Sequence, residues 1–317
     1  MEKEIPVYVF MGFLGSGKTK FSKEVLLDQG FTEGQKSLLL VCEDGEEEYD
    51  VKALNDKKID VEFINEENLT SDHLIELGNK YEPKNVIIEY NGMWELDKIF
   101  NIKVPKGWTV VQVISFVDAT TFDVYVNNMK KIMMDQLRNA DMIIFNRCDE
   151  NTKKAEYRRS IRAVNRRAQV VFENKDGSAD NSMDEEVTLP YSLDGDEIVL
   201  QDEDFGLFYI DAADNPEKYI GKKVKFRAQV HRPESYGKNA FVPGRFAMTC
   251  CANDIAFIGF KCYYGKAATL ADREWVYVEG TIDKEYYEEF GGEGPVIIAE
   301  DVSVTSKAEE DLVYFNY

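Results

Sequence analysis

A glycine-rich loop near the start of the chain carries the residue types that bind nucleotide phosphates. Residues 12–19 read GFLGSGKT and fit the pattern G-x-x-x-x-G-K-[ST] at every fixed position. Glycines let the backbone curl so that several N–H groups point at one phosphate. We expect Lys18 to reach the β- and γ-phosphates and the Thr19 hydroxyl to hold Mg²⁺. The candidate phosphate-binding residues are Gly12, Gly15, Ser16, Gly17, Lys18 and Thr19.

The segments on either side of this loop must position it. Residues 6–11 are apolar and rich in β-forming side chains, which predicts a buried parallel strand. Residues 20–27 carry apolar side chains at helical spacing. A strand, a glycine loop and a helix are the context that a phosphate loop requires, because the helix N-terminus adds partial positive charge beside the phosphate. A chance glycine-rich turn is the alternative interpretation, and it does not account for the flanking pattern.

A second short motif could select the base of the nucleotide. Residues 146–149 read NRCD, fit the pattern N-[KR]-x-D and follow an apolar run at 141–145. The Asp149 carboxylate can accept two N–H bonds from the Watson–Crick edge of guanine, which adenine does not offer in that pattern. Asn146 would bond the base from its other edge. A turn that only caps a helix is the alternative interpretation.

Length and charge limit the classes of protein to which the chain can belong. With 317 residues it is too long for one typical core, so two domains are expected. The net charge of −21 opposes broad contact with nucleic acid or an anionic membrane, and we expect no nucleic-acid partner. Neither a membrane span nor a signal peptide is expected, because long apolar runs and a cationic N-terminus are missing. Five cysteines within hydrophobic segments indicate reduced thiols and a cytoplasmic protein.

The first half of the chain alternates short apolar runs with helical stretches. This alternation predicts an α/β fold in which a parallel sheet of the P-loop NTPase type carries helices on both faces. Ser71 or Asp72 is expected to cap a helix that runs through Leu77. After the strand at 6–11, further strands are expected at residues 37–42, 85–89, 110–117, 141–145 and 170–172.

An acidic stretch separates this half from the next. Residues 173–204 contain twelve acidic side chains and a single lysine, Lys175, with Gly, Ser, Asn and Pro between them. This composition predicts a loop or linker, with a first domain at residues 1–190 and a second at residues 205–317. A solvated surface without a specific role is enough to explain the charge.

Beyond residue 205 the hydrophobic period becomes two residues, which is typical of strands. Five strands with one helix between the third and the fourth follow the order of an all-β OB-like barrel. Such barrels often bind single-stranded nucleic acid, but barrel filling explains most of the aromatic side chains here. The strands are expected at residues 223–231, 246–251, 255–263, 275–282 and 295–304, and the helical patch at 266–273.

The motifs of the first domain together resemble a known family. The loop GFLGSGKT resembles the glycine loop of CobW-type GTPases, a class that also holds the nickel-delivery GTPases of hydrogenase and urease maturation. Residues 89–92 (EYNG) resemble the ExxG Walker B element of that family, and residues 117–119 (VDA) resemble its VDA signature. Residues 136–149 are similar to the family block that ends in N-K-x-D, with Arg147 in place of the usual lysine among the nucleotide-binding residues.

This resemblance implies a protein that binds GTP and hydrolyses it to GDP and phosphate as a switch. It implies that Lys18, Asp50 and Glu89 are the catalytic residues. It also implies that Thr19, Asp50 and Glu89 surround Mg²⁺, with Asp50 as the switch residue that senses the γ-phosphate. Gly92 would approach the γ-phosphate. A protein partner or a homodimer contact would be needed for useful hydrolysis rates.

One departure from the family concerns metal delivery. Members that deliver metal carry a C-x-C-C motif between the switch and Walker B, whereas residues 62–70 here contain no cysteine. Three thiolates for a soft metal are therefore missing. Cys42 is the only cysteine nearby, and it stands where the switch usually has asparagine.

The second domain resembles the soluble C-terminal domain of bacterial membrane proteins that accompany a permease. The resemblance lies in residues 219–224, 244–252 and 275–280. Within it, Cys250 and Cys251 could hold Zn²⁺ together with His231. Neighbours on a regular strand point to opposite faces, so both thiols can meet one ion only at a bulge or strand end. Packing of a cysteine in the barrel is the alternative.

Two functions remain open from the sequence. The first is a GTPase that uses Mg²⁺ with GTP or GDP and is coupled to zinc-type metal homeostasis or metallochaperone work, with Zn²⁺ as a further candidate cofactor. The second is a GTP-dependent adaptor that docks onto an unidentified client protein, such as a permease component, with little metal binding of its own. The missing C-x-C-C motif favours the second function, whereas the family and the pair Cys250 and Cys251 favour the first.

Overall fold

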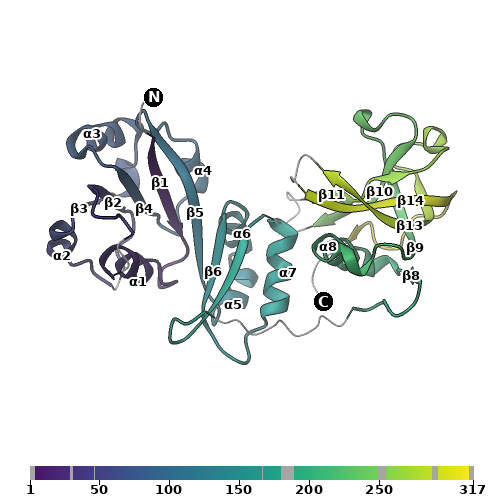
Figure 1. The fold of residues 1–317 in the computed structure, drawn as a ribbon, viewed down its shortest axis with the longest axis horizontal. Helices are drawn as coiled ribbons and strands as arrows, with labels where there is room; N and C mark the ends of the chain where they lie inside the picture. Colours follow the sequence, from purple (N-terminus) through teal and green to yellow (C-terminus); the bar gives the residue numbers. More distant parts are fainter. Residues whose placement is uncertain are drawn as a thin grey trace. The chain divides into compact units, whose positions relative to one another are not determined.

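The computed structural model describes residues 4–28, 31–45, 47–165, 167–179, 189–248, 255–287 and 292–313. The chain divides into two compact units, Met1–Met183 and Asp184–Tyr317. Figure 1 draws the first unit in purple to teal and the second in green to yellow, and each unit has its own sheet. No helix within the described ranges is long and apolar enough to span a membrane.

The first unit is built on a parallel sheet of seven strands. Its strands are β1 (Ile5–Met11), β2 (Ser37–Val41), β3 (Ile59–Phe63), β4 (Asn85–Glu89), β5 (Trp108–Asp118), β6 (Met142–Cys148) and β7 (Gln169–Asn174). The order across the sheet is β3-β2-β4-β1-β5-β6-β7, and every neighbouring pair is parallel. Every residue of β2 is buried, as expected for a strand that is covered on both faces. The predicted P-loop type of α/β sheet is therefore confirmed.

Helices connect these strands, as the crossovers of a parallel sheet require. The helices are α1 (Lys18–Lys23), α2 (Val51–Asp56), α3 (Ser71–Tyr81), α4 (Leu96–Phe100), α5 (Phe122–Asn128), α6 (Lys130–Arg138) and α7 (Lys154–Val164). α1 continues into a π-helical turn, η1 (Glu24–Asp28), and the two together cover the helix predicted at 20–27.

The N-terminus of α3 differs from the prediction. Thr70, rather than Ser71 or Asp72, is the N-cap, and its hydroxyl accepts the His73 N–H at 3.3 Å. The Ser71 hydroxyl instead accepts the backbone N–H of Lys103 at 3.1 Å. All three adjacent residue types can cap a helix, and composition alone does not show which of them takes the extended backbone that an N-cap needs.

The second unit is a closed ring of strands. Its strands are β8 (Glu197–Val199), β9 (Lys223–His231), β10 (Ala240–Met248), β11 (Ile255–Gly259), β12 (Cys262–Tyr263), β13 (Trp275–Tyr287), β14 (Gly292–Val304) and β15 (Leu312–Val313). The ring β9-β10-β12-β14-β13 closes because β10 pairs with β9 as well as with β12. All pairs within the ring are antiparallel except β12 with β14. The predicted OB-like barrel is confirmed.

Several elements of the barrel differ from their predicted bounds. β10 begins at Ala240, well before the strand predicted at 246–251, and the last three residues of that predicted strand lie outside the described residues. The strand predicted at 255–263 is split into β11 and β12. The helical patch predicted at 266–273 is reduced to a 3₁₀ turn, Ala267–Thr269.

Part of the predicted linker belongs to the second unit. Within residues 189–204, Tyr191, Ile198 and Leu200 are buried in the barrel core. An unpredicted helix, α8 (Phe205–Asp214), follows directly. The linker interpretation was wrong for these residues because apolar side chains are interspersed with the acidic ones. Most of the acidic side chains can then face water while Ile198 and Leu200 face the core, whereas Asp204 is buried and accepts the Gln201 N–H.

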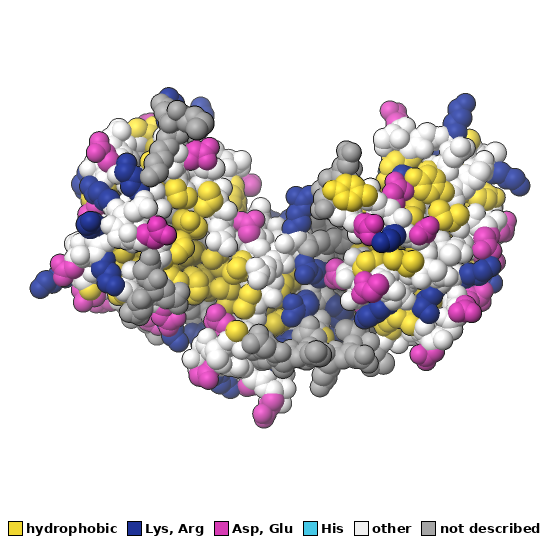
Figure 2. Space-filling model, viewed as in Figure 1, with side chains coloured by type: hydrophobic (Ala, Val, Ile, Leu, Met, Phe, Trp, Pro, Cys, Tyr) yellow, Lys and Arg dark blue, Asp and Glu magenta, His cyan; other side chains and the backbone are white. Residues whose placement is uncertain are grey.

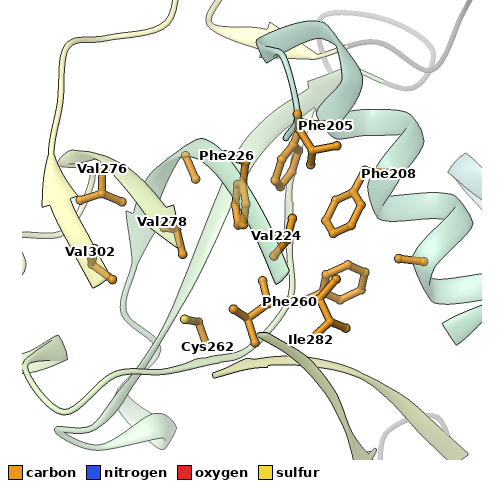
Figure 3. Packing of buried hydrophobic residues seen from close by; sticks show 14 of the residues in the cluster. Phe205, Phe208, Val224, Phe226, Phe260, Cys262, Val276, Val278, Ile282 and Val302 are labelled. Atoms are coloured by element: carbon orange, nitrogen blue, oxygen red, sulfur yellow. The ribbon is translucent and has the colours of Figure 1, made fainter. Parts of the chain in front are cut away.

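Aromatic rings fill the space between α8 and the barrel. The Phe208 ring is fully buried, and its centroid lies 5.7 Å from that of Tyr219, 6.2 Å from Phe226 and 5.9 Å from Phe260. Figure 3 shows Phe205 beside Phe208 on α8, near Phe226 of the barrel, with ring centroids of Phe205 and Phe226 5.5 Å apart. Rings of this size dominate core energetics, so α8 is an integral part of the barrel core.

Replacing Phe208 by alanine should destabilise the second unit. Removal of the ring leaves a cavity, and such truncations lower the free energy of unfolding by about 3–5 kcal/mol. Urea unfolding followed by circular dichroism should show an earlier transition. Phe63→Ala is the matched control, because Phe63 is 65% exposed and its loss should change stability by less than about 0.5 kcal/mol. Equal transitions for both variants would contradict the packing around α8.

Candidate nucleotide-binding site

The phosphate loop leaves the carboxyl end of β1, between β4 and β5 in the order of the sheet. Ligands of parallel α/β sheets bind outside the carboxyl ends of the strands. Gly12 leaves β1 with a φ of 143°, and a Cβ there would lie 2.4 Å from the carbonyl oxygen of Phe116 in β5. Glycine is required at this position, because a side chain would collide with the backbone of the neighbouring strand.

A cavity of about 340 Å³ lies over this loop. Its lining brings together Lys18, Thr19 and Arg147, which come from two separate predicted motifs. The complete lining consists of Leu14, Gly15, Gly17, Lys18, Thr19, Lys20, Glu43, Gly45, Glu47 and Arg147.

The ammonium of Lys18 is buried and fully hydrogen-bonded. Lys18 is 3% exposed, and its Nζ donates to Gly12 O at 2.7 Å and to Phe13 O at 3.0 Å. The same nitrogen forms an ion pair with Glu43 Oε2 at 2.6 Å. An ammonium group has three N–H donors, so these partners satisfy all of them. Such pairing is what allows a charge to be buried here.

Glu89 ends β4 and presents both carboxylate oxygens to hydroxyl groups. Thr19 Oγ1 donates to Oε1 at 2.6 Å, and the hydroxyl of Tyr49 donates to Oε2. Burial, together with the charge of Glu89, raises the pKa of Tyr49, so the phenol keeps its proton. Hydroxyl and carboxylate oxygens are ligands that Mg²⁺ prefers, so Thr19 and Glu89 fit the ion that a phosphate loop requires.

Asp50, the predicted switch residue, lies elsewhere. Its carboxylate caps α2 by accepting the Ala53 N–H at 3.0 Å, and its side chain is exposed. The described residues that line the cavity do not include it. The structure therefore does not bring Asp50 to Thr19 and Glu89, and its neighbour Tyr49 makes the contact with Glu89 instead.

Gly92 approaches the phosphate loop closely. A Cβ at this position would lie 2.2 Å from the carbonyl oxygen of Gly12, so only glycine fits. The Gly92 N–H donates to Glu43 Oε1 at 3.4 Å, and the Gly92 oxygen accepts Nε2 of the buried Gln136 at 2.8 Å. The carboxylate that pairs with Lys18 thus also contacts the backbone at Gly92.

The predicted base-binding residues lie at the end of β6 and just beyond it. Asn146 Nδ2 donates to Ser16 O at 2.6 Å, which ties the NRCD motif to the phosphate loop. Arg147 has a left-handed backbone, with a φ of 56°, and its Nη1 donates to Asp118 Oδ2 at 2.6 Å. The Asn146 amide therefore holds the loop, while the Arg147 side chain reaches the cavity.

Asp149 faces solvent beside these two residues. Its Oδ1 accepts the Asn151 N–H at 3.0 Å, and its Oδ2 accepts Lys175 Nζ at 2.8 Å. The bond from Lys175, followed by that from the Asn151 backbone, holds the pKa of the Asp149 carboxyl below its usual value. The bond from Asn151 is that of a local turn, whereas Lys175 lies 26 residues further along the chain. The N-cap of α7 is Lys153 rather than Asp149. The carboxylate is ionised, as guanine recognition would require.

Two residues of the site, Glu43 and Tyr49, were not predicted from the sequence. Both lie between β2 and α2. Glu43 closely follows a buried apolar strand, so the rule that ligands bind at the carboxyl ends of parallel strands could have identified it. Tyr49 gave no comparable signal, because its contact with Glu89 depends on how the chain folds back after β2.

Of the three candidate zinc residues, only His231 lies within the described residues. The described part of the chain contains no group of three or more His, Cys, Asp or Glu residues that could hold a metal ion. Cys250 and Cys251 lie outside the described residues. His231 Nδ1 lies 3.5 Å from Asp272 Oδ1, and its ring packs 5.3 Å from that of Phe257.

Comparison with known proteins identifies the first unit. Residues 6–172, more than half of the chain, match the family described as CobW/HypB/UreG, nucleotide-binding domain. The chain belongs to this family. Its first unit is therefore a P-loop GTPase domain of the CobW/HypB/UreG family. Residues 174–315 match a second family, described as DUF1980 C-terminal domain.

Individual relatives are distant from this CobW/HypB/UreG family member. The UPF0703 protein YcgQ of Bacillus subtilis (strain 168) is 27% identical over 118 residues, which are 37% of this chain and 41% of that protein. The chain thus spans about two-fifths of that relative. The Zn(II)-bound YjiA GTPase from E. coli is 17% identical with a TM-score of 0.44, over 88% of this chain and 86% of that chain. Hydrogenase maturation factor HypB from Archaeoglobus fulgidus is 20% identical with a TM-score of 0.40, over 56% and 84%.

Replacing Gly92 by alanine should disturb the phosphate loop. The new Cβ would meet the Gly12 carbonyl at 2.2 Å, and backbone atoms cannot give way as a flexible side chain can. We expect isothermal titration calorimetry to show GDP affinity lowered by about tenfold or more. Gly265→Ala is the control, because nothing lies within 4 Å of a Cβ added there. Unchanged GDP affinity in the Gly92 variant would contradict the close approach of these two segments.

Proposed function

We propose that this chain binds Mg²⁺ and GTP and hydrolyses GTP to GDP and phosphate as a switch. The proposal assigns the nucleotide to residues 1–190 and leaves residues 205–317 as the barrel domain. The observation that carries it is the cavity at the end of β1, where the buried Lys18 lies beside Thr19, and Thr19 bonds Glu89. A nucleotide phosphate requires a cation such as Lys18, and its metal ion requires oxygen ligands such as those of Thr19 and Glu89.

The residues of the site have separate roles in this proposal. The N–H groups of the loop and Lys18 bind the β- and γ-phosphates, and the Gly92 N–H faces the γ-phosphate. Thr19 and Glu89 hold the metal ion, which when bound neutralises charge on the phosphate oxygens. Asp50 would join them only after leaving its capping bond at the start of α2.

Hydrolysis is proposed to be slow in the isolated chain. Phosphoryl transfer depends on positioning and on neutralising charge in the transition state. The described cations that line the cavity are Lys18, Lys20 and Arg147. Carboxylates already pair with Lys18 and Arg147. A partner protein or a second copy of the chain would therefore complete the site.

Two roles for the switch follow from the two units, and we place both in the cytoplasm. Coupling to zinc-type metal homeostasis or metallochaperone work is supported by the family, whose description includes HypB and UreG. Zn²⁺ at Cys250, Cys251 and His231 belongs to this role. A GTP-dependent adaptor for a client protein, such as a permease component, is supported by the missing C-x-C-C motif.

Titration with Zn²⁺ while GTP turnover is followed separates the two roles. A metal-coupled GTPase should change its turnover near stoichiometric Zn²⁺, because the metal would bind the folded protein specifically. The GTP turnover of an adaptor should not change until Zn²⁺ is in large excess and binds nonspecifically. Replacing Cys250 and Cys251 together by serine is the matched comparison, and the same Zn²⁺ response in that variant would exclude the barrel cysteines as ligands.

Nucleic acid is not a proposed partner. On the face drawn in Figure 2, lysine and arginine side chains are interspersed with aspartate and glutamate. The net charge of −21 adds long-range repulsion of a polyanion. An OB-like barrel alone is a fold, and its binding partner depends on the side chains that it presents.

Replacing Lys18 by alanine should abolish nucleotide binding, because the only ammonium that lies within the phosphate loop would be lost. We expect GTP and GDP affinities measured by calorimetry to fall by about 100-fold or more. Lys238→Ala, an exposed lysine in the second unit, is the control and should bind both nucleotides as the unaltered chain does. Retained GTP affinity in the Lys18 variant would exclude this loop as the site.

Replacing Asp149 by asparagine should weaken guanine preference. The carboxylate would accept two N–H bonds from guanine, and loss of charge-assisted bonds of this kind costs about 1.5–3 kcal/mol. We expect the ratio of GTP to ATP affinity to fall by about tenfold or more. Asp72→Asn, an exposed aspartate on α3, is the control. Equal affinities of the unaltered chain for GTP and ATP would refute the assignment directly.

A further inference from the structure

Glu43 makes two contacts that a bound nucleotide would need for itself. Its Oε2 lies 2.6 Å from Lys18 Nζ, and its Oε1 accepts the Gly92 N–H at 3.4 Å. In the proposed GTPase these are the two groups that face the γ-phosphate. One carboxylate therefore bridges an ammonium and a backbone N–H as two oxygens of a phosphate would.

These contacts leave Lys18 without a spare donor. The carbonyl oxygens of Gly12 and Phe13 take two of its N–H groups, and Glu43 takes the third. A phosphate oxygen can gain the ammonium only by displacing a partner. Glu43 is the partner that must leave, because its charge repels a phosphate beside the same ammonium, whereas the carbonyls carry no net charge. The Glu43 side chain is 8% exposed, and burial strengthens this repulsion.

Tyr49 anchors the other end of the same segment. Its hydroxyl donates to Glu89 Oε2, and the residue is 9% exposed. The chain between β2 and α2 is thus held at Glu43 and at Tyr49, and α2 begins directly after its N-cap, Asp50. A displacement of Glu43 would therefore be transmitted along this short segment to the start of α2.

We propose that Glu43 is an internal mimic of the γ-phosphate and makes the site discriminate between GTP and GDP. This inference rests on the proposed function. GDP has no γ-phosphate, so its β-phosphate competes with Glu43 at Lys18 alone and leaves the bond from the Gly92 N–H in place. GTP binds only when Glu43 leaves, and the displaced segment gives the two nucleotide states different surfaces. Glu43 acts as a positioning residue that sets nucleotide preference.

Calorimetry with GDP and with the non-hydrolysable analogue GMPPNP, both in Mg²⁺, tests this inference. The unaltered chain is expected to bind GDP more tightly than GMPPNP. Glu43→Gln removes the charge but keeps an acceptor for Lys18. It should tighten GMPPNP binding by about tenfold or more and tighten GDP binding by clearly less, because GDP competes with Glu43 at Lys18 alone. Glu48→Gln, an exposed glutamate of the same segment, is the matched control and should change neither affinity.

The outcomes separate this inference from the proposed function. If Glu43→Gln shifts both nucleotides equally or weakens GMPPNP, Glu43 is not a competitor and the inference is wrong, while nucleotide binding stands. If neither the unaltered chain nor the variant binds either nucleotide, the proposed function fails and the inference with it. Thermal melting checks that each variant is folded. Should the Gln variant be unstable, Glu43→Asp, which shortens the reach by one methylene, should shift GMPPNP in the same direction by less.

Discussion

The burial of a single charge, the Lys18 ammonium, governs the arrangement of the whole site. A cation that is 3% exposed must be paired and hydrogen-bonded, and here the carbonyls of Gly12 and Phe13 and the carboxylate of Glu43 do this. The loop can curl around its own lysine only because Gly12 has a φ of 143° and Gly92 has no Cβ to collide with it. The position of Lys18 Nζ therefore depends on both backbone conformation and electrostatics. The order of the strands brings the phosphate loop and the segments with Glu43 and Gly92 close to this nitrogen.

The same constraint explains why an acidic residue is built into a site for an anion. Leaving Lys18 without a charged partner would cost several kcal/mol, and Glu43 avoids that cost. Replacement of its carboxylate by a phosphate exchanges one anion for another, so the ammonium is never left unpaired. Two conformations of the segment between β2 and α2 can then lie close in free energy, which is what allows a ligand to shift the balance between them.

How much the sequence could predict depends on how local each feature is. The loop at 12–19 and the apolar strands depend on neighbours in sequence, so they were predicted, whereas β3 was missed as a short edge strand that alternates apolar and polar residues. α8 was missed because its apolar side chains lie on all sides, since the barrel buries most of it.

Glu43 and Tyr49 join the site only through tertiary contacts. Asp50 was assigned by resemblance, but an aspartate there also suits the N-cap of α2, and its bond to Ala53 keeps it away from Glu89.

The side chains of the segment between β2 and α2 also indicate which process the switch controls. Family members that deliver metal carry their thiols between the switch and Walker B, and Cys42 is the only cysteine near that place here. Burial, followed by the charges of Glu89 and Glu43, raises the pKa of its thiol to about 12, so the thiolate that a soft metal prefers is disfavoured. The group that would be displaced by the nucleotide is a carboxylate, Glu43, and the group that anchors the segment is a phenol, Tyr49, and neither suits a soft metal. Both side chains suit a conformational change that repositions the start of α2. A change of this kind favours the adaptor role for the first unit.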